Sequence, residues 1–468
     1  MTRHILIAGT LALISTGASA LEINVTPGSL KENQTAVRTT RDDRLTLKGT
    51  ADVRDLVLLQ GLAPSVTMVD MTMLQVSAYT YPEGESYAGR TSYAANEIPP
   101  YMLIGTNVSI CRLPASVTTI GDGAFASTKV RTLVIPPSVT RIGDMAWSDC
   151  DLLQKVRFPN DVELGKGVLK DCDALTLVEY DYDVTEIPEA MFDGCDKFCQ
   201  SIPVSVTKIG RSAFRGTAFE ELDLSSVSEI GAYAFADMPN LMSVTISTNH
   251  DVNIGTGAFF NDGALAYVPL GDNNVPVLAL AHTAAGKVSV NTPTIGEAAF
   301  ANDTRTDTLT LGPAVSSIGA HAFRNMKSLT IIDAERHSAP IDDVDATAFS
   351  GLENPEGRYD IKLSVMKGTN DAWKAHPVWG LFTIGQFDVS VGDIIAEGAD
   401  ISVRRIGGEI SVTSTQPVDY VGVFSADGMV MTEARPGTET CTLSDGDTAQ
   451  VVVVKVISGG VTKVVKLK

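Results

Sequence analysis

The sequence predicts a repeat solenoid with a parallel β-sheet, its strands joined mostly by loops and short helical turns, followed by a small all-β domain. Two observations lead to this fold class. The pattern Ile-Gly-x-x-Ala-Phe returns along the chain at intervals of about 22 residues. The last 80 or so residues lack it and contain short β-branched runs separated by turn signals. A unit this short cannot bury its own apolar side, so neighbouring units must stack.

Composition narrows the class of protein. The 468 residues carry 36 Lys and Arg against 56 Asp and Glu, a formal net charge of −20. Phosphate backbones are bound by basic surfaces, so we expect no nucleic acid partner. Hydrophobic residues make up 44% of the chain and charged residues 20%, which is typical of a folded globular protein.

The N-terminus predicts a signal peptide over residues 1–20. Arg3 and His4 precede an apolar run from Ile5 to Ile14, and the small residues of Ala18–Ala20 supply a cleavage site. The run is too short to span a bilayer, so we expect no transmembrane segment. The mature chain should therefore begin near Leu21 and be exported.

The repeats define the array. Clear copies of the pattern begin at residues 120, 209, 230, 254, 295 and 318, and weaker copies in phase begin at 98, 142, 164, 187, 275 and 344. We expect a sharp turn at the Gly and a packed interior row at the Ala-Phe. About eight residues after the Phe, apolar residues alternate, which predicts a short strand with one buried face. The pairs are Leu133/Ile135, Val156/Phe158, Val178/Tyr180, Leu222/Leu224, Val244/Ile246 and Leu309/Leu311.

Phase in the repeat also predicts the interior columns. Phe125, Phe214, Phe235 and Phe300 share one phase and should form a buried column. Cysteines at 150, 172 and 195 share another, three residues after the Phe position, and should form a ladder of buried thiols. The alternative for an exported protein is a disulfide between adjacent rungs.

Two other cysteines are considered separately. Cys111 takes a strand-core position, and Cys199 follows Cys195 by four residues in the one unit (198–203) that is a residue short. A metal site at Cys195 and Cys199 would need further ligands, and none is near in sequence, so we expect no metal.

Several units match a known family almost letter for letter. PASVTTIGDGAF (114–125), PPSVTRIGDMAW (136–147) and PVSVTKIGRSAF (203–214) resemble the BspA-type leucine-rich repeat of bacterial surface proteins. The resemblance covers residues 98–384, and residues 367–384 are similar to the unit that closes such arrays. Residues 21–97 resemble the family's N-terminal flank, with degenerate repeats that would cap the array. The resemblance implies a leucine-rich repeat solenoid whose function is binding.

The C-terminal region, residues 385–468, predicts a small antiparallel sandwich resembling an immunoglobulin-like domain. VGVFSADGMVM (421–431) and KVVK (463–466) resemble the C-terminal sorting (Por) domain of type IX secretion cargo in Bacteroidetes. The chain departs from that family at 447–456, where DTAQVVVVKV replaces the usual G-x-Y-x-V. The alternative is an immunoglobulin-like spacer. The resemblance implies display at the outer-membrane surface or release outside the cell.

No catalytic residues, cofactor or metal ligands are expected. The histidines are scattered over different units, without metal-binding spacing or an obvious Ser or Cys partner: His250, His282, His321, His337 and His376. The Gly pairs at 121–123 and 255–257 belong to the repeat turn. Asp445 to Asp447 is better explained as a hairpin turn than as a calcium loop, because later ligands are missing. We therefore do not expect an enzyme.

The candidate binding face consists of strand residues that point away from the core. It should carry a basic and apolar patch over the first units and an acidic patch after them, orienting a partner of complementary charge. The alternative is a charged surface that only keeps the sheet soluble. We expect a protein ligand, such as a host matrix or cell-surface protein, with glycans as the alternative. The nine residues are Arg112, Arg131, Val134, Lys155, Arg157, Leu177, Glu179, Glu221 and Asp223.

Overall fold

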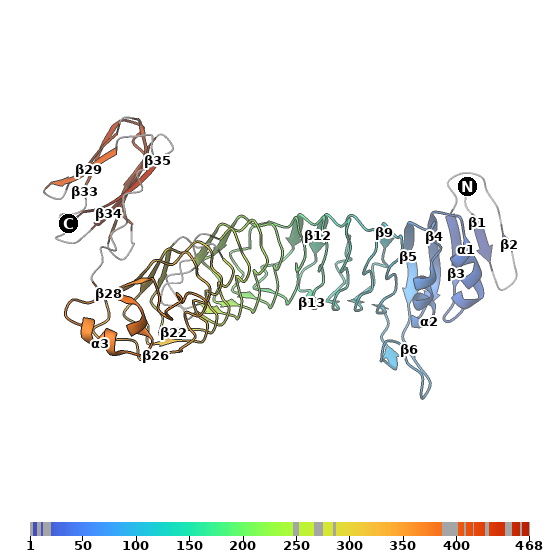
Figure 1. Cartoon of the computed structure of the whole chain (residues 1–468). Helices are drawn as coiled ribbons and strands as arrows, with labels where there is room; N and C mark the ends of the chain where they lie inside the picture. Colours follow the sequence, from blue (N-terminus) through green and yellow to red (C-terminus); the bar gives the residue numbers. More distant parts are fainter. Residues whose placement is uncertain are drawn as a thin grey trace. The chain divides into compact units, whose positions relative to one another are not determined.

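The computed structural model describes residues 3–6, 11–12, 20–246, 252–265, 275–283, 287–385, 401–406, 409–414, 416–425, 430–444, 452–458 and 461–467. The chain forms two compact units, Met1–Gly385 and Gln386–Lys468. The first unit is the predicted repeat solenoid (Figure 1). Most of the predicted signal peptide, His250, and the turn at Asp445 to Asp447 lie outside the described residues.

One side of the solenoid carries a column of longer strands, paired in parallel and in register from rung to rung. In β12, Val156 and Phe158 are buried while Arg157 is exposed, as the two-residue alternation predicts. The strands are β12 (Lys155–Phe158), β14 (Leu177–Tyr180), β17 (Glu221–Leu224), β19 (Ser243–Ile246), β21 (Lys287–Val290), β23 (Thr308–Leu311), β25 (Ile331–Ala334), β27 (Lys362–Val365) and β28 (Thr383–Gly385).

The prediction of a strand at Leu133 and Ile135 is wrong. Residues 131–135 form only an isolated bridge, between Thr132 and Lys155. Pro136 and Pro137 follow directly, and a proline has no amide hydrogen to extend a ladder. This rung therefore touches its neighbour without completing a strand.

A second column of strands runs along the other side of each rung. The Ile of the repeat and the residue before it pair in parallel with the next rung, for example Lys208↔Glu229 and Ile209↔Ile230. Two-residue strands have no alternation to detect, so one sheet was expected where there are two columns. They are β8 (Glu97–Ile98), β10 (Thr119–Ile120), β11 (Arg141–Ile142), β13 (Glu163–Leu164), β15 (Glu186–Ile187), β16 (Lys208–Ile209), β18 (Glu229–Ile230), β20 (Asn253–Ile254), β22 (Thr294–Ile295), β24 (Ser317–Ile318) and β26 (Asp343–Val344).

The predicted phenylalanine column is confirmed. Phe125, Phe214, Phe235 and Phe300 are at most 2% exposed. The rings stack along the array: Phe214 lies 5.2 Å from Phe192 and 5.5 Å from Phe235, centroid to centroid. Such offset stacking adds to the free energy of burying each ring.

The Gly of the repeat is explained by close packing between rungs. A Cβ on Gly210 would lie 2.6 Å from the backbone nitrogen of Glu189, and one on Gly231 would lie 2.6 Å from that of Arg211. The left-handed backbone conformation falls two residues later, at Ser212 (φ 53°) and Tyr233 (φ 56°). The expected turn at the Gly is thus displaced, and the Gly itself permits the approach of neighbouring rungs.

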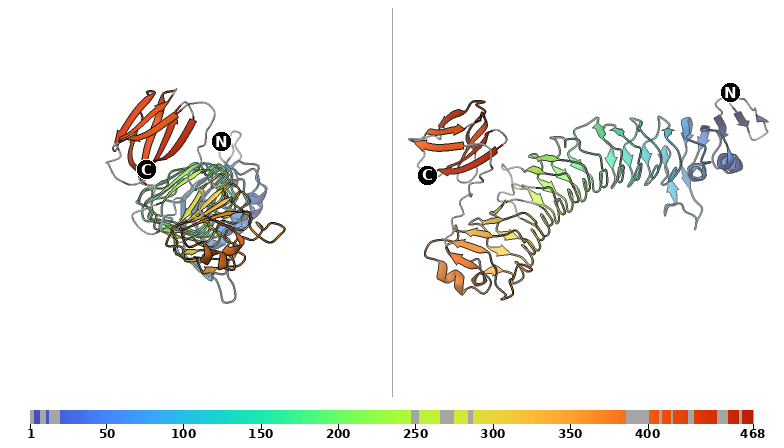
Figure 2. Two further views of the ribbon diagram at one scale, coloured as in Figure 1. Left: turned by 60° about the vertical axis from the view of Figure 1, so that its left-hand side comes forward. Right: turned by 45° about the horizontal axis from the view of Figure 1, so that its top comes forward.

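The N-terminal end of the solenoid has longer strands than the repeats. The sheet order is β2-β1-β3-β4-β5-β9, and a two-stranded hairpin projects from the array just before the first repeats (Figures 1 and 2). The elements are β1 (Arg3–Leu6), β2 (Leu11–Ala12), β3 (Ala20–Val25), η1 (Leu30–Asn33), α1 (Gln34–Thr39), β4 (Arg44–Ala51), α2 (Val53–Leu56), η2 (Val57–Gly61), β5 (Met68–Val76), β6 (Tyr79–Thr80), β7 (Ser92–Tyr93) and β9 (Ile110–Arg112).

The C-terminal end of the solenoid is closed by aromatic residues. Helices α3 (Asn370–Ala375) and η3 (Trp379–Leu381) precede β28, which pairs with β27. Trp373 and Trp379 are fully buried, and the Trp379 Nε1–H donates to the Ile341 carbonyl at 2.9 Å. The aromatic side chains cover the end of the hydrophobic core.

The second unit has the predicted all-β architecture. It contains two antiparallel sheets, β29-β30-β33 and β32-β31-β34-β35, whose valines share one core. Buried residues come from both sheets, for example Val412 from β30 and Val454 from β34. The strands are β29 (Ile401–Ile406), β30 (Glu409–Ser414), β31 (Val418–Ser425), β32 (Val430–Ala434), β33 (Thr440–Ser444), β34 (Val452–Ser458) and β35 (Val461–Leu467).

Candidate functional site

The nine residues of the candidate binding face all lie at the surface of the solenoid. Seven of them lie on strands of the solenoid, and Arg131 and Val134 lie on the rung that has only an isolated bridge. Val134 is 81% exposed, the largest apolar exposure among the nine. The remaining side chains are exposed or half-buried: Arg112, Arg131, Lys155, Arg157, Leu177, Glu179, Glu221 and Asp223. Their role in binding stays a prediction.

The expected basic patch is largely paired with carboxylates. Lys155 Nζ lies 3.0 Å from Glu179 Oε1, and Arg157 Nη2 lies 2.7 Å from Asp181 Oδ1 on the same neighbouring rung. Arg112, in the N-terminal sheet, lies 3.6 Å from Asp70. Arg131 makes no ion pair within the part of the chain that the structure describes. The basic side of the expected charge step is therefore weaker than the sequence suggests.

The ion pairs between neighbouring rungs share one direction. From residue 129 to residue 237, the cation lies on the earlier rung and the anion on the later one. Such exposed ion pairs contribute little to the stability of the fold. They are Lys129–Asp151, Lys155–Glu179, Arg157–Asp181, Lys166–Glu189, Lys170–Asp193, Lys208–Glu229 and Arg215–Asp237.

The acidic side of the face has no ion pair in the part of the chain that the structure describes. Glu220, Glu221 and Asp223 make no ion pair with any residue that the structure describes. The Asp223 carboxylate accepts a hydrogen bond from the Ser225 N–H at 3.0 Å, and hydrogen bonding from Ser225 lowers the pKa of Asp223. These carboxylates are exposed and could attract a basic partner.

A break in the column of longer strands separates the two charged regions. The rung between β14 and β17 forms no strand at residues 199–204, here named the sheet break. The second column continues past it, since β15 pairs with β16. The short unit at 198–203 was visible in the sequence, but not its consequence for the sheet.

A side chain stands in for the missing strand on one side of the sheet break. Gln200 Oε1 accepts a hydrogen bond from the Val178 N–H, and Gln200 Nε2 donates to the Val178 carbonyl, each at 2.8 Å. The amide thus satisfies the backbone of β14 as a neighbouring strand would. A hydrogen bond made by a side-chain amide leaves no alternating pattern in the sequence, so the role of Gln200 could not be predicted from it.

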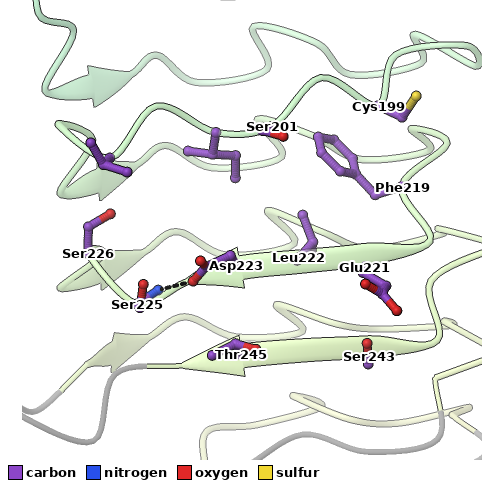
Figure 3. A pocket seen from close by; sticks show the side chains of 12 residues that line it. Cys199, Ser201, Phe219, Glu221, Leu222, Asp223, Ser225, Ser226, Ser243 and Thr245 are labelled. Atoms are coloured by element: carbon purple, nitrogen blue, oxygen red, sulfur yellow. Dashed lines mark hydrogen bonds between the residues drawn. The ribbon is translucent and has the colours of Figure 1, made fainter.

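A groove of about 400 Å³ follows the other side of the sheet break, along β17 (Figure 3). Phe219, Leu222 and Ile202 contribute apolar surface, while Glu221 and Asp223 contribute carboxylates. A second groove of about 400 Å³ lies over residues 132–137, beside the ion pairs of β12. Both grooves occur where a rung lacks its longer strand.

The predicted cysteine ladder is confirmed as buried, and its thiols are free. Cys150 Sγ donates to the Phe125 carbonyl at 3.3 Å, Cys172 to Trp147 at 3.1 Å and Cys195 to Leu169 at 3.0 Å. Burial raises the pKa of Cys195 to about 12. All six cysteines of the chain are unpaired, so the alternative of a disulfide between rungs is not formed.

The other cysteines differ in environment. Cys111 is half-buried in β9, and burial raises its pKa to about 12, whereas Cys199 is exposed at the sheet break. Among the described residues, no group of three or more His, Cys, Asp or Glu side chains could hold a metal ion.

Four histidines hydrogen-bond within the array: His282, His321, His337 and His376. His321 Nδ1 lies 3.0 Å from Ser350 Oγ, a partner 29 residues away that sequence spacing did not reveal. No acidic side chain in the described ranges hydrogen-bonds the other ring nitrogen, so the pair lacks the orienting group of a catalytic triad. His337 Nε2 bonds the Gly312 carbonyl at 2.8 Å. Both contacts join neighbouring rungs.

The same interior phase that holds the thiols also holds buried polar side chains, one of which is incompletely hydrogen-bonded. Thr217 donates to the Phe214 carbonyl at 2.7 Å, and Asp262 Oδ1 accepts from the Met238 N–H at 2.8 Å. Asp262 Oδ2 is buried without a partner among the described residues. Burial raises the pKa of Asp262 well above its ordinary value.

Tyrosines gather on the hairpin β6–β7, which the sequence analysis did not single out. Tyr81 packs edge-on against Tyr79 at 5.0 Å and against Tyr93 at 6.4 Å. Arg54 lies 4.0 Å above the Tyr79 ring and Arg90 lies 4.4 Å above the Tyr93 ring. An arginine therefore covers one face of the Tyr79 ring and one face of the Tyr93 ring, and these faces are closed to a sugar.

The comparisons with known proteins agree with this architecture. The family described as "BspA type Leucine rich repeat region" matches in six copies, over residues 96–198, 162–278 and 286–357. No curated protein is similar enough in sequence to count as a match. In the described part of the chain, no helix is long and apolar enough to cross a membrane.

Solved structures with some similarity include leucine-rich repeat proteins and a vaccine antigen. A leucine-rich repeat protein from Bacteroides ovatus is 18% identical, with a TM-score of 0.36, covering 51% of this chain and 72% of that one. The pneumococcal vaccine antigen PcpA is 15% identical, with a TM-score of 0.43, covering 80% and 91%. A leucine rich cell surface protein from Faecalibacterium prausnitzii is 18% identical, with a TM-score of 0.32, covering 66% and 91%.

Proposed function

The chain belongs to the family of BspA-type leucine-rich repeat proteins, and from this premise we propose that it is a protein-recognition scaffold displayed outside the cell. Its ligand is a protein, and its role is that of an adhesin for a host matrix or cell-surface protein. Binding uses the candidate binding face. The proposal includes no cofactor and no catalytic step.

The observation that carries the proposal is the register of the longer strands. Lys155 lies beside Leu177, and Arg157 beside Glu179, so side chains from separate rungs form one continuous outward surface. Val134 and Arg131, a cation with no ion pair among the described residues, extend this surface to the preceding rung, which the bridge between Thr132 and Lys155 joins to β12. An extended surface of this kind is what repeat arrays use to bind proteins.

A binding panel tests this proposal. The mature chain, residues 21–468, would be measured against immobilised matrix proteins and, in parallel, against a glycan array. We expect saturable binding to a protein and loss of affinity for Arg131→Glu. Arg211→Glu is the matched control, because Arg211 is also exposed and unpaired in the described chain but lies by the second column. Binding to glycans alone would favour a carbohydrate-associated surface protein, and equal effects of both variants would place the ligand elsewhere.

We further propose that residues 1–20 direct export and that residues 385–468 are a sorting domain for type IX secretion. The resemblance of 421–431 and 463–466 to that domain supports this, as does the separate compactness of Gln386–Lys468. Deleting residues 385–468 should leave a folded array in the periplasm of its native host. Surface display of the truncated protein, detected by antibody on intact cells, would overturn the sorting role and leave the binding role untouched.

A further inference from the structure

Strand β17 has an open edge that faces the sheet break. On its other side it pairs with β19, where the Met242 N–H bonds the Glu220 carbonyl at 2.8 Å. Backbone groups of successive residues in a strand point alternately to the two neighbours. The N–H and C=O groups of Glu221 and Asp223 therefore point toward the sheet break. No backbone hydrogen bond in the described chain reaches either residue from residues 199–204.

The two strands that border the sheet break are treated differently. The Val178 edge of β14 is occupied by the Gln200 side chain, as described above. Among the described residues no side chain takes this place at the β17 edge, and the groove lies against it (Figure 3). An open strand edge is a template for pairing with another extended chain.

The walls of the groove indicate what kind of chain it fits. Phe219 and Ile202 provide apolar contact on the floor, and Val204, 89% exposed, adds an unprotected apolar side chain at the margin. Glu221 and Asp223 project from the open strand itself and lack cations in the described chain. An extended peptide paired with β17 would place its side chains beside these carboxylates, and positive charge would complement them.

We propose that the sheet break is a strand-addition site, in which an extended basic segment of a protein partner pairs with the open edge of β17. The site rests on the proposed function, because it names the partner chemistry for one part of the same face. Backbone hydrogen bonds to Glu221 and Asp223 give the affinity. Lysine or arginine residues that alternate with apolar residues give the specificity.

The test uses three synthetic eight-residue peptides and the full mature chain. The first alternates lysine with valine or threonine, the second replaces each lysine by glutamate, and the third is the lysine peptide with alternate amides N-methylated. At low salt, we expect the lysine peptide to bind at least tenfold more tightly than either other peptide. Equal binding of the N-methylated peptide would overturn strand addition, since methylated amides cannot donate hydrogen bonds.

A pair of charge variants localises the binding. Glu221→Lys with Asp223→Lys should weaken the lysine peptide at least tenfold, while Glu163→Lys with Glu186→Lys, on exposed residues of the second column, should not. Hydrogen exchange gives a readout that does not depend on a variant folding. The amides of residues 221–224 should become protected when the lysine peptide binds. The proposal would be wrong if no peptide binds and the neutral variant Glu221→Gln with Asp223→Asn self-associates. In that case the two carboxylates only prevent strand edges of different molecules from pairing.

The two proposals can fail separately. If Arg131→Glu abolishes binding of a matrix protein while no peptide binds at the sheet break, the strand-addition site is wrong and the binding face stands. If the lysine peptide binds and protects residues 221–224 but no protein ligand binds the mature chain, the site stands and its partner lies outside that panel.

Discussion

The rungs on the two sides of the sheet break carry charge differently. Before the break, Lys155 and Arg157 on β12 pair with Glu179 and Asp181, so the surface is charged but locally neutral. After the break, Glu221 and Asp223 on β17 have no cation among the described residues. The same strand positions therefore serve stacking in one region and present uncompensated charge in the other. Outward residues in a repeat cannot be assigned one role from their phase alone.

The interiors of the two regions differ as well. Before the break, Cys150, Cys172 and Cys195 each donate to a backbone carbonyl, so the interior phase three residues after the Phe is satisfied. After it, the same phase reaches Asp262, whose second oxygen is buried without a partner in the described chain. One rung of the second region thus carries an incompletely hydrogen-bonded group at this interior position, whereas Thr217 and Asp303 at the same phase are hydrogen-bonded.

The largest expected effect is on the aromatic column that joins the regions. Phe214→Ala should lower the free energy of unfolding by about 3–5 kcal/mol, because it empties a buried site between Phe192 and Phe235. Chemical denaturation measures this. Phe260→Ala is the control, since Phe260 is only half-buried and should cost less. A loss below about 1 kcal/mol with a cooperative transition would mean that the column does not carry the array.

The next largest effect is expected when the Gln200 side chain, which replaces a neighbouring strand, is removed. Gln200→Ala should cost about 1–2 kcal/mol, because it leaves the Val178 N–H and carbonyl without partners in a half-buried setting. It should also speed hydrogen exchange at Val178, which makes β14 resemble β17. Gln154→Ala is the control, because Gln154 is exposed and its loss should change stability by less than about 0.5 kcal/mol. Equal exchange at Val178 in variant and parent would argue that Gln200 does not close the edge.

A smaller effect of opposite sign is expected at Asp262. Burial raises its pKa in the folded chain, so the unfolded chain loses this proton first as the pH rises. Its contribution to stability is thus greatest below the ordinary pKa of an aspartate and falls toward neutral pH. Asp262→Asn should stabilise the chain at pH 7 by on the order of 1 kcal/mol and should have less effect near pH 4.

The control for this prediction is another buried aspartate. Asp303 accepts hydrogen bonds from Thr283 and from the N–H groups of Arg305 and Thr306. Asp303→Asn should therefore destabilise the chain at pH 7. Urea unfolding at both pH values distinguishes the two cases, and a stabilising Asp303→Asn would contradict the explanation.

The smallest effect on stability is expected for the paired cations. Lys155→Glu with Arg157→Glu should reduce ligand binding at low ionic strength, where electrostatic attraction is strongest, and should barely change the melting temperature. The side chains are 44% and 64% exposed, so solvent screens the ion pairs that are lost. Unchanged binding at low salt would mean that the paired region only keeps the sheet soluble.

The phase of the repeat predicted the features that recur in every rung, namely which side chains are buried and which are exposed. Phe214 and Cys172 are buried because their positions recur, and Arg157 is exposed for the same reason. What could not be predicted arises where one rung departs from the rest. Gln200 binds through its side chain, and the rungs are offset by differing numbers of residues, so the partner of Lys155 could not be identified by counting. The grooves follow from those departures.

Between residues 129 and 237, the one-way ion pairs give complementary ends to the rung junctions that they cross. A cut after the rung of β12 would leave Lys155, Arg157 and Lys166 on the end of one fragment. It would leave their partners Glu179, Asp181 and Glu189 on the other. Two copies of the same fragment would meet like charge with like charge, whereas the two different fragments would attract in the correct order. The charges at such a cut would therefore favour reassembly of the two fragments in the native order.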